Sequence, residues 1–239
     1  MKSILEQEKD KKLYHIKPNK FSVHRSSLLI PKLKNFCTQI SFLNHFFLKR
    51  NNNQVSLKVS AYNNEGRCVD TFFEELIEKK VYSYSLEDIF KDTKTVSYQA
   101  EFFSGKNLFI PFPAVIVSHY SKNCYNMVHS YNRVLNDLEE DFKINSEHTS
   151  EGAIESYFNK DIESGFIIHT GQKKLNQNID LLIYKNKRKI KKKIKVNLNP
   201  FNTKLISLKK YINKNSKGIS NNQVFFIKAP QQEFFYGRL

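Results

Sequence analysis

The chain has 239 residues, of which 40% are hydrophobic and 13% aromatic; this is the composition of a globular protein and excludes an intrinsically disordered one. Its net charge of +16 comes from 39 basic residues against 23 acidic ones. Most of the basic residues are lysines, whereas proteins that read bases rely on the bidentate contacts of arginine. The composition therefore argues against a nucleic-acid partner.

The sequence also lacks the features of an exported or membrane protein. No apolar run reaches the roughly 18 residues that a membrane span requires, and the polar N-terminal residues lack the apolar block of a secretory signal. We therefore expect a cytoplasmic protein with no membrane span. The cysteines form no CxxC pair and predict reduced, partly buried thiols. They are Cys37, Cys68 and Cys124.

In chain order, the sequence begins with a basic arm and continues into a β-rich module. Residues 1–35 are basic and irregular, and 21–33 can add an edge strand that ends at Pro31. Residues 36–106 form the expected first module. Within it, 54–62 alternates apolar and polar residues, which is typical of a half-buried strand. Turn-forming asparagines and a glycine follow, and further strands are predicted over 67–76, 81–86 and 95–103.

The expected second module, 151–239, presents similar blocks in the same order. The matched blocks are FLNHF with FIIHT, VSLKVSAYNN with IDLLIYKNK, VYSYSLEDIF with KLISLKKYI, and QAEFFSGK with QQEFFYGR. We interpret this order as an internal duplication. His45 and His169 occupy matched positions, which favours a structural role for both. The sequence therefore predicts an all-β fold of two tandem, duplicated antiparallel β-sandwich modules with a unique connecting segment.

The connecting segment, 107–150, has no second copy, and its backbone is open to two interpretations. A strand is predicted over 114–120, but both a helix and a strand fit 124–138. If it is a strand, a loop of two or four residues pairs position 119 with 126 and places His119 and His129 on opposite faces. A loop of three residues pairs position 119 with 127 and places both histidines on one face.

This segment also contains the densest cluster of polar and aromatic residues in the chain. Asparagine and aspartate can contact hydroxyl groups, tyrosine or histidine offers a stacking face, and arginine pairs with a carboxylate. The sequence thus predicts a non-catalytic binding protein for a polar ligand, a carbohydrate or acidic glycan, bound through 119–137. The candidate ligand-binding residues are His119, His129, Tyr131, Asn132, Arg133, Asn136 and Asp137.

Two other functions stay open at this point. The chain is an enzyme if His119 and His129 act together as an acid/base pair or as metal ligands, and a purely structural assembly protein if the cluster only ties a loop. The spacing H-x4-C-x4-H around Cys124 fits no structural zinc pattern, and nothing marks that thiol as activated. We therefore assign no catalytic residue, metal site or cofactor.

In the basic run 185–195, every second residue from Lys189 to Lys195 is a lysine, and Ile190 and Ile194 lie between them with Lys192 as the exception. That pattern predicts an exposed strand with a solvated lysine ladder, which also protects a sheet edge from aggregation. A polyanion-binding surface is the alternative interpretation of the same residues.

Overall fold

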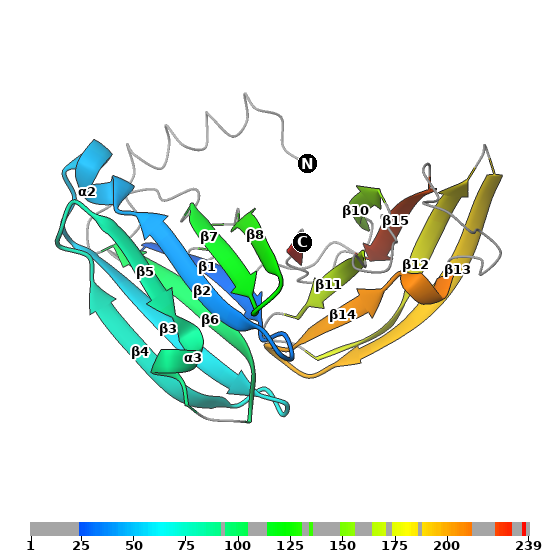
Figure 1. Ribbon diagram of the computed structural model, residues 1–239, viewed down its shortest axis with the longest axis horizontal. Helices are drawn as coiled ribbons and strands as arrows, with labels where there is room; N and C mark the ends of the chain where they lie inside the picture. The colour runs from blue at the N-terminus through cyan, green and yellow to red at the C-terminus, as the bar shows by residue number, and fades with distance from the viewer. Residues whose placement is uncertain are drawn as a thin grey trace. The chain divides into compact units, whose positions relative to one another are not determined.

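The computed structural model describes residues 24–91, 94–104, 114–130, 134–135, 149–155, 164–170, 174–185, 188–211, 223–230 and 236–237. These residues form four antiparallel sheets with very little helix, which confirms the all-β prediction (Figure 1). The chain divides into two units. Within the described part, no helix has the length and apolar character needed to cross a membrane.

The first unit comprises the described residues of Met1–Ala61, Cys68–Thr93 and Tyr98–Phe142, and it contains two sheets. The five-stranded sheet has the order β4-β3-β6-β1-β9. Its strands are β1 (His24–Pro31), β3 (Val55–Asn63), β4 (Cys68–Glu75), β6 (Thr95–Ser104) and β9 (Val134–Leu135). The expected strand that ends at Pro31 is therefore present, but its predicted edge position is wrong, because β1 lies between β6 and β9 in the sheet.

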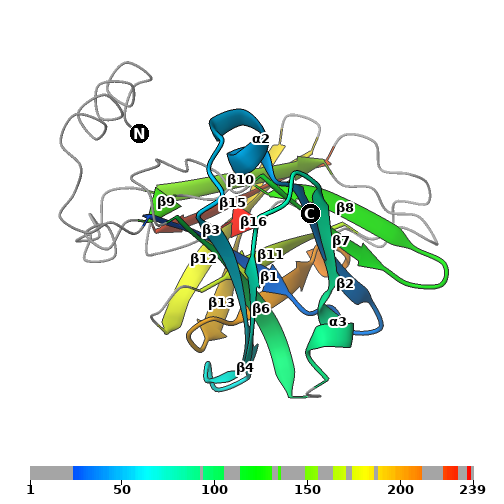
Figure 2. The ribbon, with the colours of Figure 1, turned by 90° about the vertical axis from the view of Figure 1, so that its left-hand side faces the viewer.

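The four-stranded sheet of this unit has the order β5-β2-β7-β8. Its strands are β2 (Cys37–Leu43), β5 (Val81–Ser85), β7 (Val115–Tyr120) and β8 (Tyr125–Ser130). Figure 2 shows β2, β7 and β8 together on one side of β3, β4 and β6. Strands β7 and β8 come from the expected connecting segment, so this part of the segment is a component of the first unit's sheet.

The core of the first unit lies between the two sheets. Ile40 and Phe42 from β2 pack with Leu57 and Val59 from β3 in a single cluster, to which β1 and β7 also contribute. Alternate residues are buried along β2 and along the first half of β3, as a sandwich of two sheets with one inner face each requires. The opposite face of each sheet therefore remains for other contacts.

Two short helices in the first unit were not predicted. Helix α2 (His45–Arg50) begins after Asn44, whose side chain accepts a hydrogen bond from the Phe47 amide, and it ends at Asn51 in the left-handed conformation. Helix α3 (Leu86–Ile89) directly follows β5. The sequence predicted only strands within the first module, and the capped helical turn α2 departs from that expectation.

The second unit also contains two sheets and its own core. One sheet has the order β10-β15-β12-β13, and the other has the order β14-β11-β16. Apolar residues of β11, β12, β13 and β14 form a core cluster that includes Ile168, Ile179, Val196 and Ile206. The elements are β10 (Thr149–Glu155), β11 (Gly165–His169), β12 (Leu175–Lys185), β13 (Arg188–Leu198), β14 (Thr203–Ser207), η1 (Lys209–Tyr211), β15 (Gln223–Pro230) and β16 (Tyr236–Gly237).

Residues Tyr62–Arg67 and Lys94–Ser97 also belong to the second unit. The Tyr62 ring stacks on Phe201 with 4.4 Å between ring centroids. The side-chain amide of Asn202 donates to the backbone carbonyl of Asn63 at 3.1 Å. Gly66 has a φ of +80°, and a Cβ atom there would lie 2.5 Å from the Pro200 carbonyl oxygen. Both the backbone conformation and the space therefore require glycine at this turn.

Two of the sequence matches do not correspond in the structure. His45 begins helix α2, whereas His169 ends strand β11, so their matched spacing does not reflect matched positions. The block QAEFFSGK begins within β6, which pairs with β3 and β1, whereas the described part of QQEFFYGR is β16, which pairs with β11. The expectation of partly buried cysteines is also wrong, because all three thiols are free and exposed.

Candidate functional site

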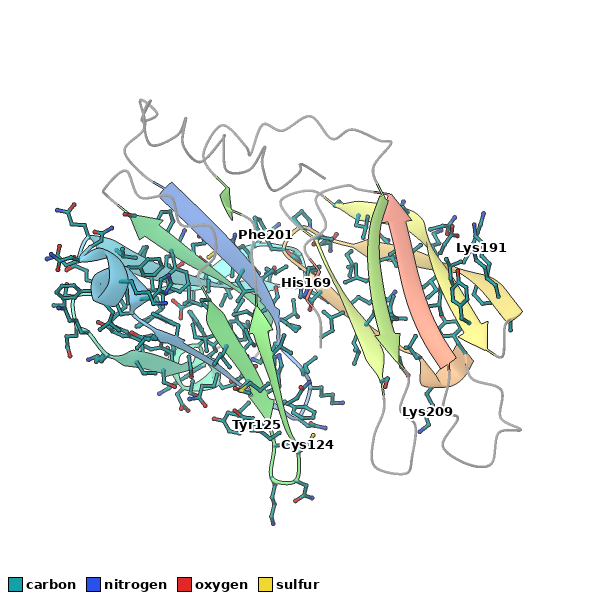
Figure 3. The ribbon with its side chains drawn as sticks, turned by 90° about the horizontal axis from the view of Figure 1, so that it is seen from above. Cys124, Tyr125, His169, Lys191, Phe201 and Lys209 are labelled. Atoms are coloured by element: carbon teal, nitrogen blue, oxygen red, sulfur yellow. The ribbon has the colours of Figure 1, made fainter. Side chains whose placement is uncertain are left out.

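Strands β7 and β8 form a hairpin with a four-residue turn, 121–124. Val117 pairs with Val128 and Tyr120 with Tyr125, so 125–130 is the strand, not the helix, of the two interpretations. The Ser121 amide donates to the Cys124 carbonyl at 2.8 Å and closes the turn. Figure 3 shows Cys124 and Tyr125 at this closed end of the hairpin.

The register decides where the two candidate histidines lie. Position 119 pairs with Asn126, and position 129 pairs with Ile116. Because 116 and 119 differ by an odd number of residues, positions 119 and 129 belong to opposite faces of the sheet. The four-residue turn thus selects the register in which the two histidines do not share a site.

The outer face of the β5-β2-β7-β8 sheet is the candidate site, and the register assigns its residues to rows across the strands. One row is Ser85, Gln39, Ser118 and Met127, and the next begins with Ser83 and Ser41 and continues to Ile116 and position 129. A third row, at the end of the hairpin, is Cys37, Tyr120 and Tyr125. Apart from position 129, whose side chain is not described, every side chain in these three rows is without formal charge at neutral pH.

Hydroxyl and amide groups at the centre of this outer face bond to one another. The Gln39 amide donates to the Ser83 hydroxyl. The hydroxyls of Ser41 and Ser83 lie 2.9 Å apart. Hydroxyls both donate and accept, so a group that bonds a neighbour keeps capacity for a further partner. The centre of the face is therefore a surface of adaptable donors and acceptors.

Aromatic and thioether groups flank this polar centre on the β8 side. The Tyr125 side chain is 65% exposed and Met127 is 57% exposed. The Tyr125 hydroxyl lies 3.0 Å from the Ser118 hydroxyl, which is itself buried. This bond orients the Tyr125 side chain from its polar end, while the ring stays accessible to a ligand.

His119 occupies the inner face, away from these groups. It is 1% exposed, and its Nδ1 atom lies 3.4 Å from the Thr38 hydroxyl. Its Nε2 atom has no hydrogen-bond partner within the described residues. Burial lowers the pKa of His119 to about 4, because the charged form would lose its hydration. His119 is therefore a neutral core residue near pH 7.

A partly buried carboxylate, that of Glu87, also holds the start of β2. One Glu87 carboxylate oxygen accepts from the Thr38 amide at 2.5 Å, and the other accepts from the Tyr98 hydroxyl at 3.4 Å. Burial, with Glu87 as a further cause, raises the pKa of Tyr98. These bonds fix helix α3 to the sheet and serve the fold.

The remaining candidates from the sequence are not placed by the structure. Of these candidates, position 129 is described by its backbone in β8. The described residues around the others are those of β8 and of the short strand β9. Tyr131, Asn132, Arg133, Asn136 and Asp137 lie outside the described residues. Among the described residues, no group of three or more acidic, histidine or cysteine side chains could hold a metal ion.

The sequence analysis missed the contributions of β2 and β5 to this face. Gln39 and Ser41 alternate with buried residues in β2, and Ser83 alternates with Tyr82 and Tyr84 in β5. That alternation of small polar with large apolar residues was the available indication. The pairing that brings β2 beside β7 spans about 80 residues of sequence, which no local pattern encodes.

In comparisons with protein-family models, with curated proteins and with solved structures, no match to this chain was found.

Proposed function

We propose that this chain is a non-catalytic binding protein whose ligand is a hydroxyl-rich molecule of the carbohydrate class. The ligand lies on the outer face of the β5-β2-β7-β8 sheet. The observation that carries this proposal is the combination of the exposed Tyr125 ring, held by its bond to Ser118, with the hydroxyl and amide groups of Ser41, Ser83 and Gln39 on a face whose described side chains carry no formal charge.

Carbohydrates present alternating hydroxyl groups and apolar patches of C–H bonds. The apolar face of a sugar ring stacks on Tyr125, and its hydroxyls exchange hydrogen bonds with the serine and glutamine side chains. Because sheet strands hold these groups in a fixed register, little conformational entropy is lost when the ligand binds. This is the usual mixture of aromatic and polar groups in small-molecule sites.

Neutral sugars suit this face better than acidic ones. Its described side chains contain no cation, and a buried or stacked carboxylate needs one as a partner. The expectation of an acidic glycan depends on Arg133, which lies outside the described residues. Uronate-containing oligosaccharides are therefore the comparison ligands in the test, and neutral oligosaccharides are the expected ones.

A catalytic alternative has less geometric support. It requires His119 and His129 to converge, and their positions belong to opposite faces of the sheet. A neutral, buried His119 with a pKa of about 4 is also poorly matched to proton transfer near pH 7.

We further infer that the two units are tandem copies of one sandwich. If β1 to β7 are matched in chain order with β10 to β16, the sheets of the two units have the same strand order. The order β4-β3-β6-β1 matches β13-β12-β15-β10, and the order β5-β2-β7 matches β14-β11-β16. The pairs Gln39 with Ser85 and Gly165 with Ser207 are then equivalent, and each serine precedes a wholly buried leucine. On this register, Gly165, Ile167 and Leu205 replace Gln39, Ser41 and Ser83. The polar face is thus specific to the first unit.

The proposal is tested on an array of neutral and uronate-containing oligosaccharides. The unmodified protein is expected to bind neutral members, and Tyr125→Ala is expected to weaken binding by roughly fivefold to 150-fold, since about 1–3 kcal/mol of stacking and burial is lost. Tyr184→Ala, at an exposed tyrosine of β12, is the matched control and is expected to bind normally. Absence of binding to every oligosaccharide, or equal losses in both variants, would overturn the proposal.

A further inference from the structure

Strand β13 forms an edge of its sheet in the part of the chain that the structure describes. All its residues, from Arg188 to Leu198, pair with β12, and no second described strand lies beside it (Figure 1). An edge strand presents a row of N–H and C=O groups that another extended chain can pair with. Eleven residues of regular strand provide such a row.

One face of β13 carries a regular ladder of lysines. These lysines alternate with other residues, so neighbouring members are about 6.6 Å apart along the strand. The register places them opposite Tyr184, Leu182, Asp180 and Asn178 of β12. The ladder is Lys189, Lys191, Lys193 and Lys195, all of them exposed.

The structure already contains one carboxylate bound to this ladder from a neighbouring strand. Asp180 of β12 pairs directly with Lys193, and its carboxylate lies 2.7 Å from the ammonium of Lys191, diagonally across the two strands. Lys191, labelled in Figure 3, remains 55% exposed in this pair. A carboxylate on a strand along the other side of β13 would meet the lysines in equivalent geometry.

We propose that the free edge of β13 binds an extended acidic peptide as an added strand. The backbone of the peptide continues the sheet, and its acidic residues, at every second position, lie beside the lysine ladder. Two extended strands have the same residue repeat, so the match holds at each successive pair. A β13 edge from a second copy would instead be repelled by its like charges.

A peptide fits these observations better than a nucleic acid or another polyanion. A nucleic acid would use the charges alone and would gain nothing from an unpaired strand edge. Lysine provides point charges without the bidentate geometry with which arginine recognises phosphates. The edge, the two-residue spacing and the Asp180 contact together favour a strand with alternating carboxylates. This inference concerns the second unit and is independent of the carbohydrate proposal.

The test measures binding of a fluorescent, end-blocked octapeptide of alternating Glu and Thr by anisotropy. The comparison peptide has the same composition with all Glu residues grouped first. A third peptide carries N-methyl groups at alternate backbone nitrogens, which removes the pairing groups and keeps the charge. We expect the alternating peptide to bind most tightly, and the N-methylated and grouped peptides to bind at least several-fold more weakly.

Two charge-matched protein variants complete the test. The variant K189Q/K193Q/K195Q is expected to weaken binding about tenfold, because three exposed ion pairs are lost. The variant K174Q/K204Q/K209Q removes the same charge from exposed lysines elsewhere in the second unit and is expected to bind nearly normally. Equal binding of the three peptides, equal losses in both variants, or tighter binding of single-stranded RNA to the same lysines would overturn the proposal.

Discussion

The hydroxyl groups of Ser118 and Tyr125 lie 3.0 Å apart on adjacent strands, although neither residue is directly opposite the other. Ser118 is buried beneath this contact, while the Tyr125 ring remains exposed. The bond therefore presents an accessible aromatic ring in a defined orientation. This geometry is typical of a recognition surface, since an exposed ring without a tether would lose more entropy on binding.

Tyr125→Phe distinguishes the contribution of the hydrogen bond to Ser118 from that of the aromatic ring. The variant keeps the stacking surface and loses the bond to Ser118, so we expect oligosaccharide affinity to fall several-fold, less than in Tyr125→Ala. The free energy of unfolding should change by less than about 1 kcal/mol, because the side chain is exposed. Titration calorimetry and denaturant unfolding measure the two quantities. A phenylalanine variant as weak as the alanine variant would show that the ring itself makes no contribution.

Stability should fall as the pH falls below 6.5. His119 and His169 are buried, and burial lowers the pKa of each from 6.5 to about 4. Between these values the unfolded chain binds a proton that the folded chain does not, so folding is progressively disfavoured. Each histidine lowers the free energy of unfolding by up to about 3 kcal/mol at pH 4. Denaturant unfolding from pH 7 to pH 4 measures the loss.

The substitution His119→Leu provides the control for this pH dependence. Leucine fills the buried site without a titrating group, so the variant should retain only the part of the pH dependence that comes from His169. A pH dependence as steep as that of the unmodified protein would show that His119 is not the group responsible.

Gly66→Ala should destabilise the protein by about 2 kcal/mol or more. The positive φ disfavours any side chain, and the new Cβ would lie against the rigid Pro200 carbonyl oxygen. Gly165→Ala is a useful comparison, because Gly165 has no positive φ and the nearest contact of its Cβ is the flexible end of Leu205, at 3.0 Å. Thermal unfolding should show the larger loss at Gly66. The reverse order would contradict the described turn.

Asp180→Asn should have opposite consequences for stability and for peptide binding. The lost contact with Lys191 is a partly exposed ion pair, so the free energy of unfolding should change by less than about 1 kcal/mol. The released lysine is then available to an added strand, and affinity for the alternating acidic peptide should rise roughly twofold to threefold. An unchanged or weaker affinity would argue against binding along this ladder.

Local alternation predicted most strands well. The period of two in the sequence located β3, and the exposed strand predicted from the basic run 185–195 corresponds to β13. Helices α2 and α3 were missed because six and four residues are too short to display a helical period. Strand β10 was missed because its sequence, TSEGAIE, shows no regular alternation of apolar and polar residues.

The candidate site could be predicted only in part, because its residues come together through long-range pairing. The sequence allowed two registers for His119, and the observed pairing with Asn126 is one of them. Only the length of the turn could select between the two. Ser83 and Gln39 join the site because β5 and β7 both pair with β2. Such pairings depend on the whole fold and not on the local sequence.

The native thiols allow the most direct test of the proposed carbohydrate face. Cys37 shares a row with Tyr120 and Tyr125, and Cys124 precedes Tyr125 in the turn, whereas Cys68 lies on β4 in the other sheet. All three are free and exposed, so each can be alkylated.

The measurement is the alkylation rate of each cysteine by mass spectrometry, with and without the oligosaccharide that binds best on the array. Ligand on the outer face of the β5-β2-β7-β8 sheet should slow alkylation of Cys37 and Cys124 several-fold and leave Cys68 unchanged. Unchanged rates at Cys37 and Cys124 in the presence of saturating ligand, or protection of Cys68 alone, would contradict the account.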